Sequence, residues 1–435
     1  MITMKNKLFY LWTILFIPVF LLLSTLCLPS QYENSYMGEL KYKYSRLKNT
    51  TGKRIIIVGG SAMAFDIDSS LIKENFPEYE IINLGMYAGL GTATVLDMAI
   101  SYCHDGDIII FAPEQNPQTL SLYLGSEYAW QAVDGAFNML PFFLRSEKNI
   151  SLMAAAFPKF AARKIKMFVT DSAPDPDSVY RKSAFNEYGD IADNLSQNIM
   201  INGLDTDTPI SYEQGSLTNE YITYLNTCGA SALKRNATLV LAYCPSNKAA
   251  VTKADAPDFE STIDEYGLFL KNALTINIIG NPNDSIMDME WFYDTNFHLN
   301  SSGKIFYTRL LIRNLKAYLS DSSLTAIEIP SKPPLLYESG TETKVLTAGT
   351  YSNNTTITSI TVDKDISMIE DYAFNGCSSL KEIHIKNTVP SSIQIGQHLL
   401  DGTSANIFVP ESALSTYKTD YRFSLYSDRI FAEKK

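Results

Sequence analysis

Short apolar runs alternate with helical patterns through the middle of the chain. The runs are rich in β-branched residues and lie at 55–58, 80–84, 107–112, 238–243 and 275–279. Helical patterns lie at 68–75, 92–103, 218–234, 258–273 and 302–320. Strands that are apolar on both faces and are separated by helices are typical of a parallel sheet covered on both sides. Residues 53–322 are therefore expected to form a three-layer α/β domain.

This rhythm stops between residues 117 and 217, which we interpret as an insertion. The segment is rich in aromatic residues, methionine and alanine, and includes Tyr128, Trp130, Phe143 and Phe160. A long insertion beside the carboxyl edge of a sheet is typical of a lid or a substrate platform. The alternative is an additional packing subdomain without a role in binding.

The N-terminus carries an apolar run from residue 8 to residue 28 without a charge. As a helix it would be about 30 Å long, enough to cross the hydrocarbon core of a bilayer. Lys5 and Lys7 precede it and favour a cytoplasmic N-terminus. We therefore expect residues 1–29 to be a single-pass signal anchor, with a cleaved signal peptide as the alternative. Residues 30–52 are expected to be a polar, basic stalk, and everything beyond them to be extracellular.

After residue 322 a linker and a repeat follow. Pro330, Pro333 and Pro334 mark the linker, 323–340. Short alternating strands at 360–362, 383–385 and 407–409 then recur at spacings of 23 and 24 residues. This period predicts a leucine-rich solenoid over 341–435, in which each rung buries its apolar face against its neighbours.

Composition narrows the function classes. The net charge of −11 argues against a nucleic-acid partner, because phosphate binding needs clustered cations. The five cysteines form no CxxC and no Cys/His ligand spacing, so neither a metal site nor a cofactor is expected. Pairing of Cys228 with Cys244 stays open, with free thiols favoured.

Elimination among four histidines points to one candidate base. In open α/β sheets the site lies beyond the carboxyl ends of the strands. His384 and His398 belong to the repeat, and His104 precedes a strand, which places it at the opposite edge. His298 is the histidine that can reach Ser61, which follows Gly59-Gly60 at the end of the first strand.

A serine hydroxyl and a histidine together suggest nucleophilic catalysis. The serine loses its proton to a base during attack, and histidine accepts a proton near neutral pH. A carboxylate would hold the imidazole tautomer, and Asp294 is the nearest candidate, ahead of Asp288 and Glu290.

A tetrahedral intermediate would need hydrogen-bond donors for its oxyanion. The amides of residues 61–63, with that of Ser61 first, are candidates at a helix start. Gly85 or Gly89 offers a second amide after the second strand, and the side chain of Asn116 a third donor. The glycines open the second β/α unit, and the full dinucleotide-binding fingerprint is absent.

Taken in linear order, these motifs resemble the SGNH (GDSL-like) hydrolase superfamily over roughly residues 54–320. The Ser block resembles 59–61, the Gly block 83–85 with Gly89, and the His block 298–300 with Gly303. The Asn block has the family's spacing from Asp107 to Asn116, but Glu114 and Pro117 replace the usual Gly and final Asp. The resemblance implies an ester hydrolase or acyltransferase with Ser61 as nucleophile and His298 as base.

One position departs from the pattern at the acid. The family's acid lies three residues before the histidine, where this chain has Thr295, and Asp294 lies four before. Either a local bulge restores a triad or the site works as a Ser–His dyad. An anchored chain of this kind is similar to exported acyltransfer proteins such as the D-alanyl transfer protein of lipoteichoic acid synthesis and the alginate O-acetylation proteins. That similarity implies an acyl group on a cell-envelope glycan.

The C-terminal segment resembles the bacterial surface-protein (BspA-like) leucine-rich repeat over roughly 340–432. The resemblance rests on residues 369–383, and the ending 407–410, with Tyr417, Lys418 and Ile430, resembles that family's cap. It implies an extracellular module that binds a protein or glycan ligand, with a passive spacer as the alternative.

Two functions from different classes follow. The first is an extracellular serine esterase or O-acyltransferase that acts on an acylated glycan or another ester. The second is a surface adhesin whose α/β domain is catalytically inactive, as the shifted acid and the altered Asn block suggest.

Overall fold

The computed structural model describes most of the chain from residue 24 onward. The described residues divide into two compact units, one with an α/β sheet and one with the repeat. Among the described residues, the first lies within 24–196, 206–292 and 296–332, and the second within 197–205, 293–295 and 333–433. The described ranges are 24–117, 119–124, 128–174, 178–200, 203–252, 259–320, 329–333, 344–346, 351, 354–364, 366–369, 373–374, 376–395, 399–400, 403–420 and 423–433.

A five-stranded parallel sheet forms the centre of the first unit, in the order β2-β1-β3-β4-β6. Each of the five apolar runs forms a strand, so this prediction is confirmed. The register places Ile55, Ile56 and Ile57 of β1 beside Ile108, Ile109 and Ile110 of β3. The strands are β1 (Arg54–Val58), β2 (Glu80–Asn83), β3 (Ile108–Phe111), β4 (Thr238–Ala242) and β6 (Asn277–Ile279), and a separate pair is β5 (Ser246–Asn247) and β7 (Ile286–Met287).

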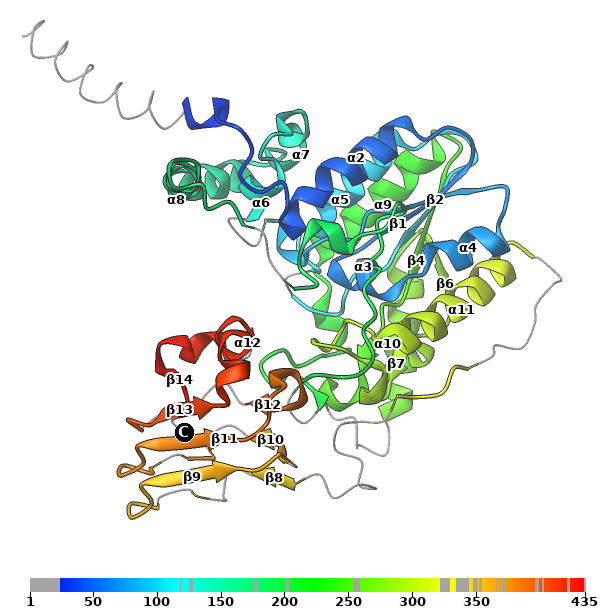
Figure 1. Cartoon of the computed structure of the whole chain (residues 1–435). Helices are drawn as coiled ribbons and strands as arrows, with labels where there is room; N and C mark the ends of the chain where they lie inside the picture. Colours follow the sequence, from blue (N-terminus) through cyan, green and yellow to red (C-terminus); the bar gives the residue numbers. More distant parts are fainter. Residues whose placement is uncertain are drawn as a thin grey trace, which may run out of the picture. The chain divides into compact units, whose positions relative to one another are not determined.

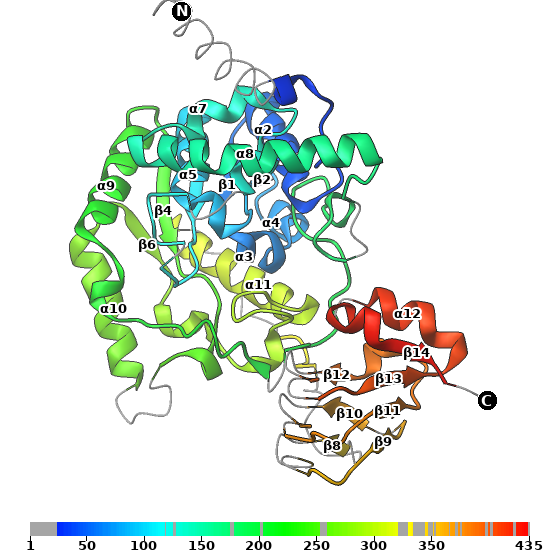
Figure 2. The ribbon, with the colours of Figure 1, turned by 90° about the vertical axis from the view of Figure 1, so that its left-hand side faces the viewer.

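Helices cover both faces of this sheet (Figures 1 and 2). On one face lie α2, α5 and α9, and on the other α3, α4 and α11. The five predicted helices form close to their expected bounds. The helices are α2 (Leu40–Asn49), α3 (Ser61–Asp66), α4 (Ser69–Asn75), α5 (Thr92–Tyr102), α9 (Asn219–Leu233), α10 (Phe259–Ala273) and α11 (Ser301–Tyr318). Short 3-10 turns are Thr25–Cys27 (η1), Tyr36–Glu39 (η2), Ala88–Leu90 (η3), Lys248–Ala250 (η8), Pro282–Ser285 (η9) and Met289–Trp291 (η10).

The predicted stalk is packed onto the α/β unit instead of extending through solvent. Helix α2 buries Leu40, Tyr44 and Leu47 and also the ammonium group of Lys43. That group donates hydrogen bonds to the carbonyls of Asn83 and Gly189. A buried lysine with two backbone acceptors cannot be distinguished by composition from a solvated one, which explains why the segment reads as a linker in the sequence.

The insertion contains a helical part and a long irregular part. Its longest element is α8 (Glu147–Thr170), which is capped by Ser146, whose side chain accepts a hydrogen bond from the amide of Asn149. Asp171 ends it in the left-handed conformation, with φ 49°. The other elements are α6 (Tyr128–Ala132), Phe137–Met139 (η4), α7 (Leu140–Phe143), Lys182–Ala184 (η5) and Gln214–Ser216 (η7).

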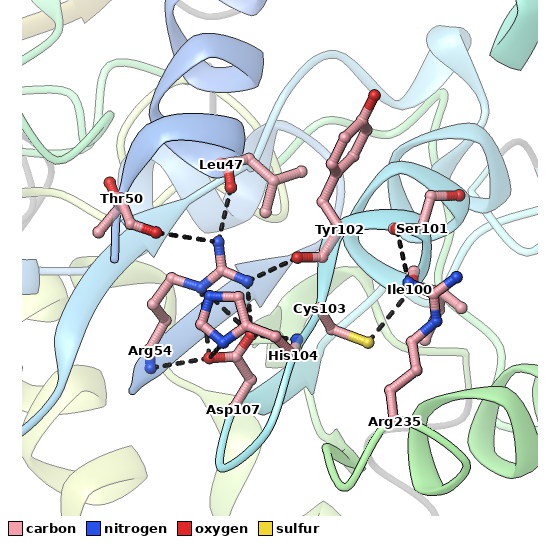
Figure 3. A network of polar contacts seen from close by, with 10 residues as sticks. All are labelled: Leu47, Thr50, Arg54, Ile100, Ser101, Tyr102, Cys103, His104, Asp107 and Arg235. Carbon is pink, nitrogen blue, oxygen red and sulfur yellow. Dashed lines mark hydrogen bonds and ion pairs between the residues drawn. The ribbon is translucent and has the colours of Figure 1, made fainter. Parts of the chain in front are cut away.

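A buried ion pair lies at the amino edge of the sheet, where the N-terminal ends of its parallel strands meet (Figure 3). Arg54 and Asp107 are each 1% exposed. The Arg54 guanidinium donates to the Asp107 carboxylate at 2.5–3.2 Å and to the carbonyls of Leu47 and Tyr102, each at 2.6 Å. Asp107 also accepts from the amide of His104 at 2.9 Å, and the His104 Nδ1 lies 3.4 Å from it. The network therefore satisfies charges that would otherwise be costly to bury.

The repeat forms two parallel sheets in the second unit. One has the order β14-β13-β11-β9 and the other β12-β10-β8. Ile360, Ile383, Ile407 and Ile430 lie in register and point into one apolar core with Phe374. The three predicted strands are confirmed and a fourth, β14, follows them. The elements are β8 (Lys344–Leu346), β9 (Ser359–Val362), β10 (Ile366–Ile369), β11 (Glu382–Ile385), β12 (Gln394–Ile395), β13 (Asn406–Val409), β14 (Ile430–Ala432), α12 (Leu414–Thr419), Pro390–Ser392 (η11), Glu411–Ala413 (η12) and Ser424–Arg429 (η13).

The predicted signal anchor and the linker fall mainly outside the described residues. The described residues begin at residue 24, near the end of the apolar run 8–28, and do not include residues 321–328 and 334–343. Within the described ranges, no helix combines the length and the apolar character needed to cross a bilayer.

Candidate functional site

The two residues predicted to react together are in contact. The Oγ of Ser61 lies 2.8 Å from the Nε2 of His298. Ser61 is the first residue of α3, directly after β1 and the Gly59-Gly60 turn, so it lies at the carboxyl edge of the sheet. The imidazole is 4% exposed, and Ser61 is half-buried. The geometry is that of a hydroxyl hydrogen-bonded to a candidate base.

Helix α3 also fixes the position of the imidazole. Phe65 follows Ser61 by one helical turn, so both side chains lie on the same helix face. The Phe65 ring stacks on the His298 ring, with centroids 3.9 Å apart and an interplanar angle of 4°. Next to it, an Asp66 carboxylate oxygen accepts the amide of Leu299 at 2.7 Å. The short helix α3 therefore carries the Ser61 hydroxyl and holds the loop around His298, here called the histidine loop, at two points. These are the imidazole ring and the amide of Leu299.

The histidine loop is fixed on its other side by the start of α11. The Oδ1 of Asn300 caps this helix by accepting the amide of Gly303 at 3.0 Å. Its Nδ2 donates to the carbonyls of Glu290, at 2.6 Å, and Phe292, at 3.1 Å. The resulting hydrogen bonds leave the backbone around His298 with little freedom, which favours a preorganised ring.

A residue that the sequence did not indicate contacts the second imidazole nitrogen. The hydroxyl of Tyr180 lies 3.3 Å from the Nδ1 of His298. Tyr180 belongs to the irregular part of the insertion, and its ring packs against Tyr36 and Phe65. It is 38% exposed. Nothing in its local sequence separates it from the other aromatic residues of the insertion, so only the fold could identify it.

The three candidate acids have different surroundings. Asp294 is half-buried and belongs to the second unit, so its role as orienter of His298 stays a prediction. Asp288, an alternative, pairs with the ammonium group of Lys332 at 2.5 Å. Glu290, the other alternative, lies 3.8 Å from the same group.

A buried carboxyl group accepts hydrogen bonds from the backbone amides of the residues on either side of Ser61. Glu114, which is 2% exposed, accepts the amide of Gly60 at 3.1 Å and the amide of Ala62 at 2.9 Å. Burial raises the pKa of Glu114, and the two amides together with His298 partly oppose that rise. The Glu114 carboxylate packs closely on Gly60, since a Cβ there would lie 2.1 Å from it and the carboxylate would have to move. Among the amides of residues 61–63, predicted to bind an anion, the amide of Ala62 thus already donates to an internal carboxyl group.

Of the other predicted oxyanion donors, one has its amide engaged by a neighbouring side chain and two stay predictions. The Gly85 amide donates to the Oδ1 of Asn83 at 2.8 Å, so it is engaged within its own turn. Gly85 instead allows close packing, since a Cβ there would lie 2.5 Å from the Ala64 nitrogen of α3. The Oδ1 of Asn116 accepts the amide of Thr119 at 3.4 Å. Gly89 is buried in η3, and its role and that of Asn116 as donors stay predictions.

A tyrosine-lined cavity borders the residues on either side of Glu114. Pro113 and Gln115 form one wall, and the remaining walls come from the end of β4, from helices α9 and α10 and from residues of the insertion. Gln115 accepts the Tyr266 hydroxyl at 3.0 Å and donates to Ser216 at 2.9 Å. The lining is otherwise mostly apolar, with the rings of Tyr212, Tyr221 and Tyr266 in it.

Neither metal clusters nor disulfides occur in the part of the chain that the structure describes. No group of three His, Cys, Asp or Glu side chains there could hold a metal ion. All five cysteines are free thiols, including Cys228 and Cys244. Burial raises the pKa of both of these thiols, which makes them poor nucleophiles.

Comparison with known families identifies the C-terminal part. Residues 344–428 match the BspA type leucine rich repeat region, with six copies. These residues are a BspA-type leucine-rich repeat region. The match does not extend to the α/β unit. No curated protein matches the chain.

The BspA-type repeat region exposes one face of its four-stranded sheet. Thr361, His384 and Phe408 lie side by side on successive strands, and Phe431 continues the row. His384 and Phe408 stack with centroids 5.1 Å apart. The two imidazole nitrogens of His384 face carboxylates, that of Glu382 at 3.2 Å and that of Glu433 at 3.3 Å.

Proposed function

We propose that the α/β unit is a serine-dependent ester hydrolase or O-acyltransferase of the SGNH type. The observation that carries the proposal is the 2.8 Å contact between the Ser61 hydroxyl and the His298 Nε2. The strand order β2-β1-β3-β4-β6 supports it, because the order of a doubly wound sheet places ligands beyond the carboxyl ends of its strands, where this pair lies.

The chemistry follows from the pair. The Ser61 Oγ attacks the acyl carbonyl carbon while His298 Nε2 accepts the hydroxyl proton. The ester C–O bond then breaks, and His298 returns the proton to the leaving alcohol, which gives an acyl-serine. Water or a sugar hydroxyl attacks this ester in turn and loses its proton to His298. The bond between the acyl carbon and the Ser61 Oγ then breaks, and His298 returns the proton to the Oγ, which restores the free enzyme. When Nε2 accepts, Nδ1 carries the hydrogen and donates to the Tyr180 hydroxyl.

The proposed substrate is an acyl group on a cell-envelope glycan or another ester, outside the cell. Support comes from the apolar run 8–28, proposed as a signal anchor, and from the BspA-type repeat region, which is proposed to bind a protein or glycan ligand. A passive spacer is the alternative role for the repeat. Binding of the full chain to immobilised glycans, compared with a Phe408→Ala/Phe431→Ala variant, tests that role.

The direct test of the enzyme is replacement of Ser61. The full chain in detergent is expected to hydrolyse p-nitrophenyl acetate and to be labelled by a fluorophosphonate. Ser61→Ala should remove the label and lower turnover by roughly 10³-fold or more. Ser70→Ala, at an exposed serine in the first turn of α4, is the matched control and should change neither. Undiminished labelling of Ser61→Ala would reject Ser61 as the nucleophile.

One observation favours the second candidate, a surface-binding protein with an inactive α/β unit. The Glu114 carboxylate binds the amides that flank Ser61, where donors for an oxyanion would be needed. Replacement by the family residue, Glu114→Gly, separates the two candidates. If Glu114 blocks the site, this variant gains esterase turnover. If Glu114 positions the Ser61 turn in an active enzyme, turnover falls and Glu114→Gln retains more of it than Glu114→Gly.

A further inference from the structure

Helix α8 has an inner face that is packed and an outer face that is unusually apolar. Met153, Phe160 and Lys164 lie on the buried face. Five large hydrophobic side chains of α8 are exposed, some on its outer face and some along its border with the packed face, and they are five of the thirteen such exposures among the described residues. They are Ile150 at 48%, Leu152 at 40%, Ile165 at 39%, Phe168 at 47% and Val169 at 75%. Such a concentration on one helix marks an interaction surface rather than scattered exposure.

Cations accompany the apolar side chains on the same helix. Although the chain carries a net charge of −11, α8 contains five basic residues and one acidic residue. Lys148 and Lys166 are eighteen residues apart, about five turns, and point in the same direction. Both are exposed, as are Lys159 and Arg163. Ile165 and Val169 lie on the adjoining stripe, so the outer face combines an apolar stripe with a basic one.

The inner face of α8 fixes the residues that directly follow the apolar run 8–28. The Lys164 ammonium group, fully buried, pairs with Asp134 at 2.6 Å and donates to the carbonyl of Leu28 at 2.9 Å. Asp134 in turn accepts the amide of Gln31 at 2.9 Å. The views in Figures 1 and 2 agree that η1 lies beside this part of the insertion. The end of the apolar run is thus fastened to the same helix that carries the exposed apolar and basic stripes.

We propose that α8 is an interfacial helix that lies on an anionic lipid bilayer. Ile165, Phe168 and Val169 enter the boundary between headgroups and acyl chains, and the basic stripe binds anionic phosphate headgroups. A bilayer accounts for both stripes together, since the apolar one alone would suit any nonpolar partner. The inference is independent of the chemistry at Ser61, and it gives the α/β unit a fixed orientation on the membrane surface.

A fluorophore on α8 tests the contact in the full chain. In a Cys27→Ser background, which removes the exposed thiol, Val169→Cys carries an environment-sensitive nitrobenzoxadiazole label. Leu268→Cys, 59% exposed on α10, is the matched control. On reconstitution into vesicles of phosphatidylglycerol and phosphatidylcholine, the label at 169 should shift to shorter wavelength and become protected from aqueous quencher. The label at 268 should do neither, and Lys148→Glu/Lys166→Glu should reduce the effect at 169.

Four outcomes would overturn the proposal. One is a label at 169 that stays fully accessible in vesicles, and another is a shift of equal size at 268. A shift that occurs without lipid and grows with protein concentration would show that a second copy of the chain covers α8. An effect of equal size in pure phosphatidylcholine, unchanged by the charge-reversed variant, would contradict recognition of anionic headgroups.

Discussion

The two edges of the central sheet each carry a histidine near a polar side chain, yet they are built in different ways. At the amino edge, His104 lies beside Asp107, whose carboxylate is saturated by the Arg54 guanidinium and by backbone amides. At the carboxyl edge, the nitrogens of His298 contact two hydroxyls, those of Ser61 and Tyr180. Neither hydroxyl belongs to a fully buried side chain. At the amino edge both buried charges have their partners, which stabilises the fold. At the carboxyl edge the imidazole lies next to a partly accessible hydroxyl, an arrangement that leaves room for a reaction.

The largest expected difference between the edges is in turnover. His298→Ala should lower the proposed esterase turnover by roughly 10³-fold or more, because the base that accepts the Ser61 proton is lost. His104→Ala, the matched histidine at the amino edge, should leave turnover unchanged. Steady-state hydrolysis of p-nitrophenyl acetate measures both. Equal losses in the two variants would contradict the functional assignment of the carboxyl edge.

The reverse difference is expected in stability. Asp107→Ala leaves the Arg54 guanidinium buried without its partner, which costs about 3–5 kcal/mol of unfolding free energy. Turnover per folded molecule should stay close to that of the unchanged chain. Urea unfolding, followed by tryptophan fluorescence, gives the stability. His104→Ala should cost under about 1 kcal/mol, since its ring is largely exposed. A small loss in Asp107→Ala would show that the network does not hold this edge.

A pH-dependent difference is expected from the lysine behind the carboxyl edge. Burial lowers the pKa of Lys43 to about 7, from an ordinary value near 10.5. Between these values the unfolded chain holds a proton that the folded chain has lost, so the unfolding free energy rises with pH, by up to about 1.4 kcal/mol per unit. Lys43→Met should lack this contribution. Urea unfolding at pH values from about 7.5 to about 9.5 gives the slope of the unfolding free energy against pH. Equal slopes for the unchanged chain and for Lys43→Met would contradict the prediction.

The smallest expected effect concerns the hydroxyl on the second nitrogen of His298. Tyr180→Phe removes one hydrogen bond while it keeps the ring against Phe65, which corresponds to about 1 kcal/mol. Turnover should therefore fall by roughly fivefold. Phe185→Leu, a change in the same insertion away from the imidazole, serves as the control. A loss as large as that of His298→Ala would mean that Tyr180 itself takes part in the chemistry.

Much of the sheet could be predicted because its signal is local and strong. Five apolar runs predict strands buried on both faces, and repeated isoleucines 23 and 24 residues apart predict the repeat strands. The pairing of Ser61 with His298 could be predicted from the sequence for a different reason. The chain has four histidines, and strand polarity places only one of them at the correct edge.

The remaining features depend on tertiary contacts that leave no local signal. Lys43 looks like a solvated residue of a basic linker until two distant carbonyls surround its ammonium group. Tyr180 is one aromatic residue among many in the insertion. Glu114 stands out only as a departure from a motif, and its hydrogen bonds to the Ser61 turn depend on the register between β1 and β3. Long-range geometry, rather than composition, decides the function of each.

The contact between Ser61 and His298 joins residues 237 positions apart. A contact between residues so far apart in sequence carries a large loop-closure entropy, and pairing of the intervening strands shortens the loop that has to close. A chain emerging from a translocation channel or a ribosome would expose its hydroxyl long before the imidazole exists beside it. The proposed nucleophile of a nascent chain would therefore lack its proposed base until residue 298 has been synthesised and the sheet has formed.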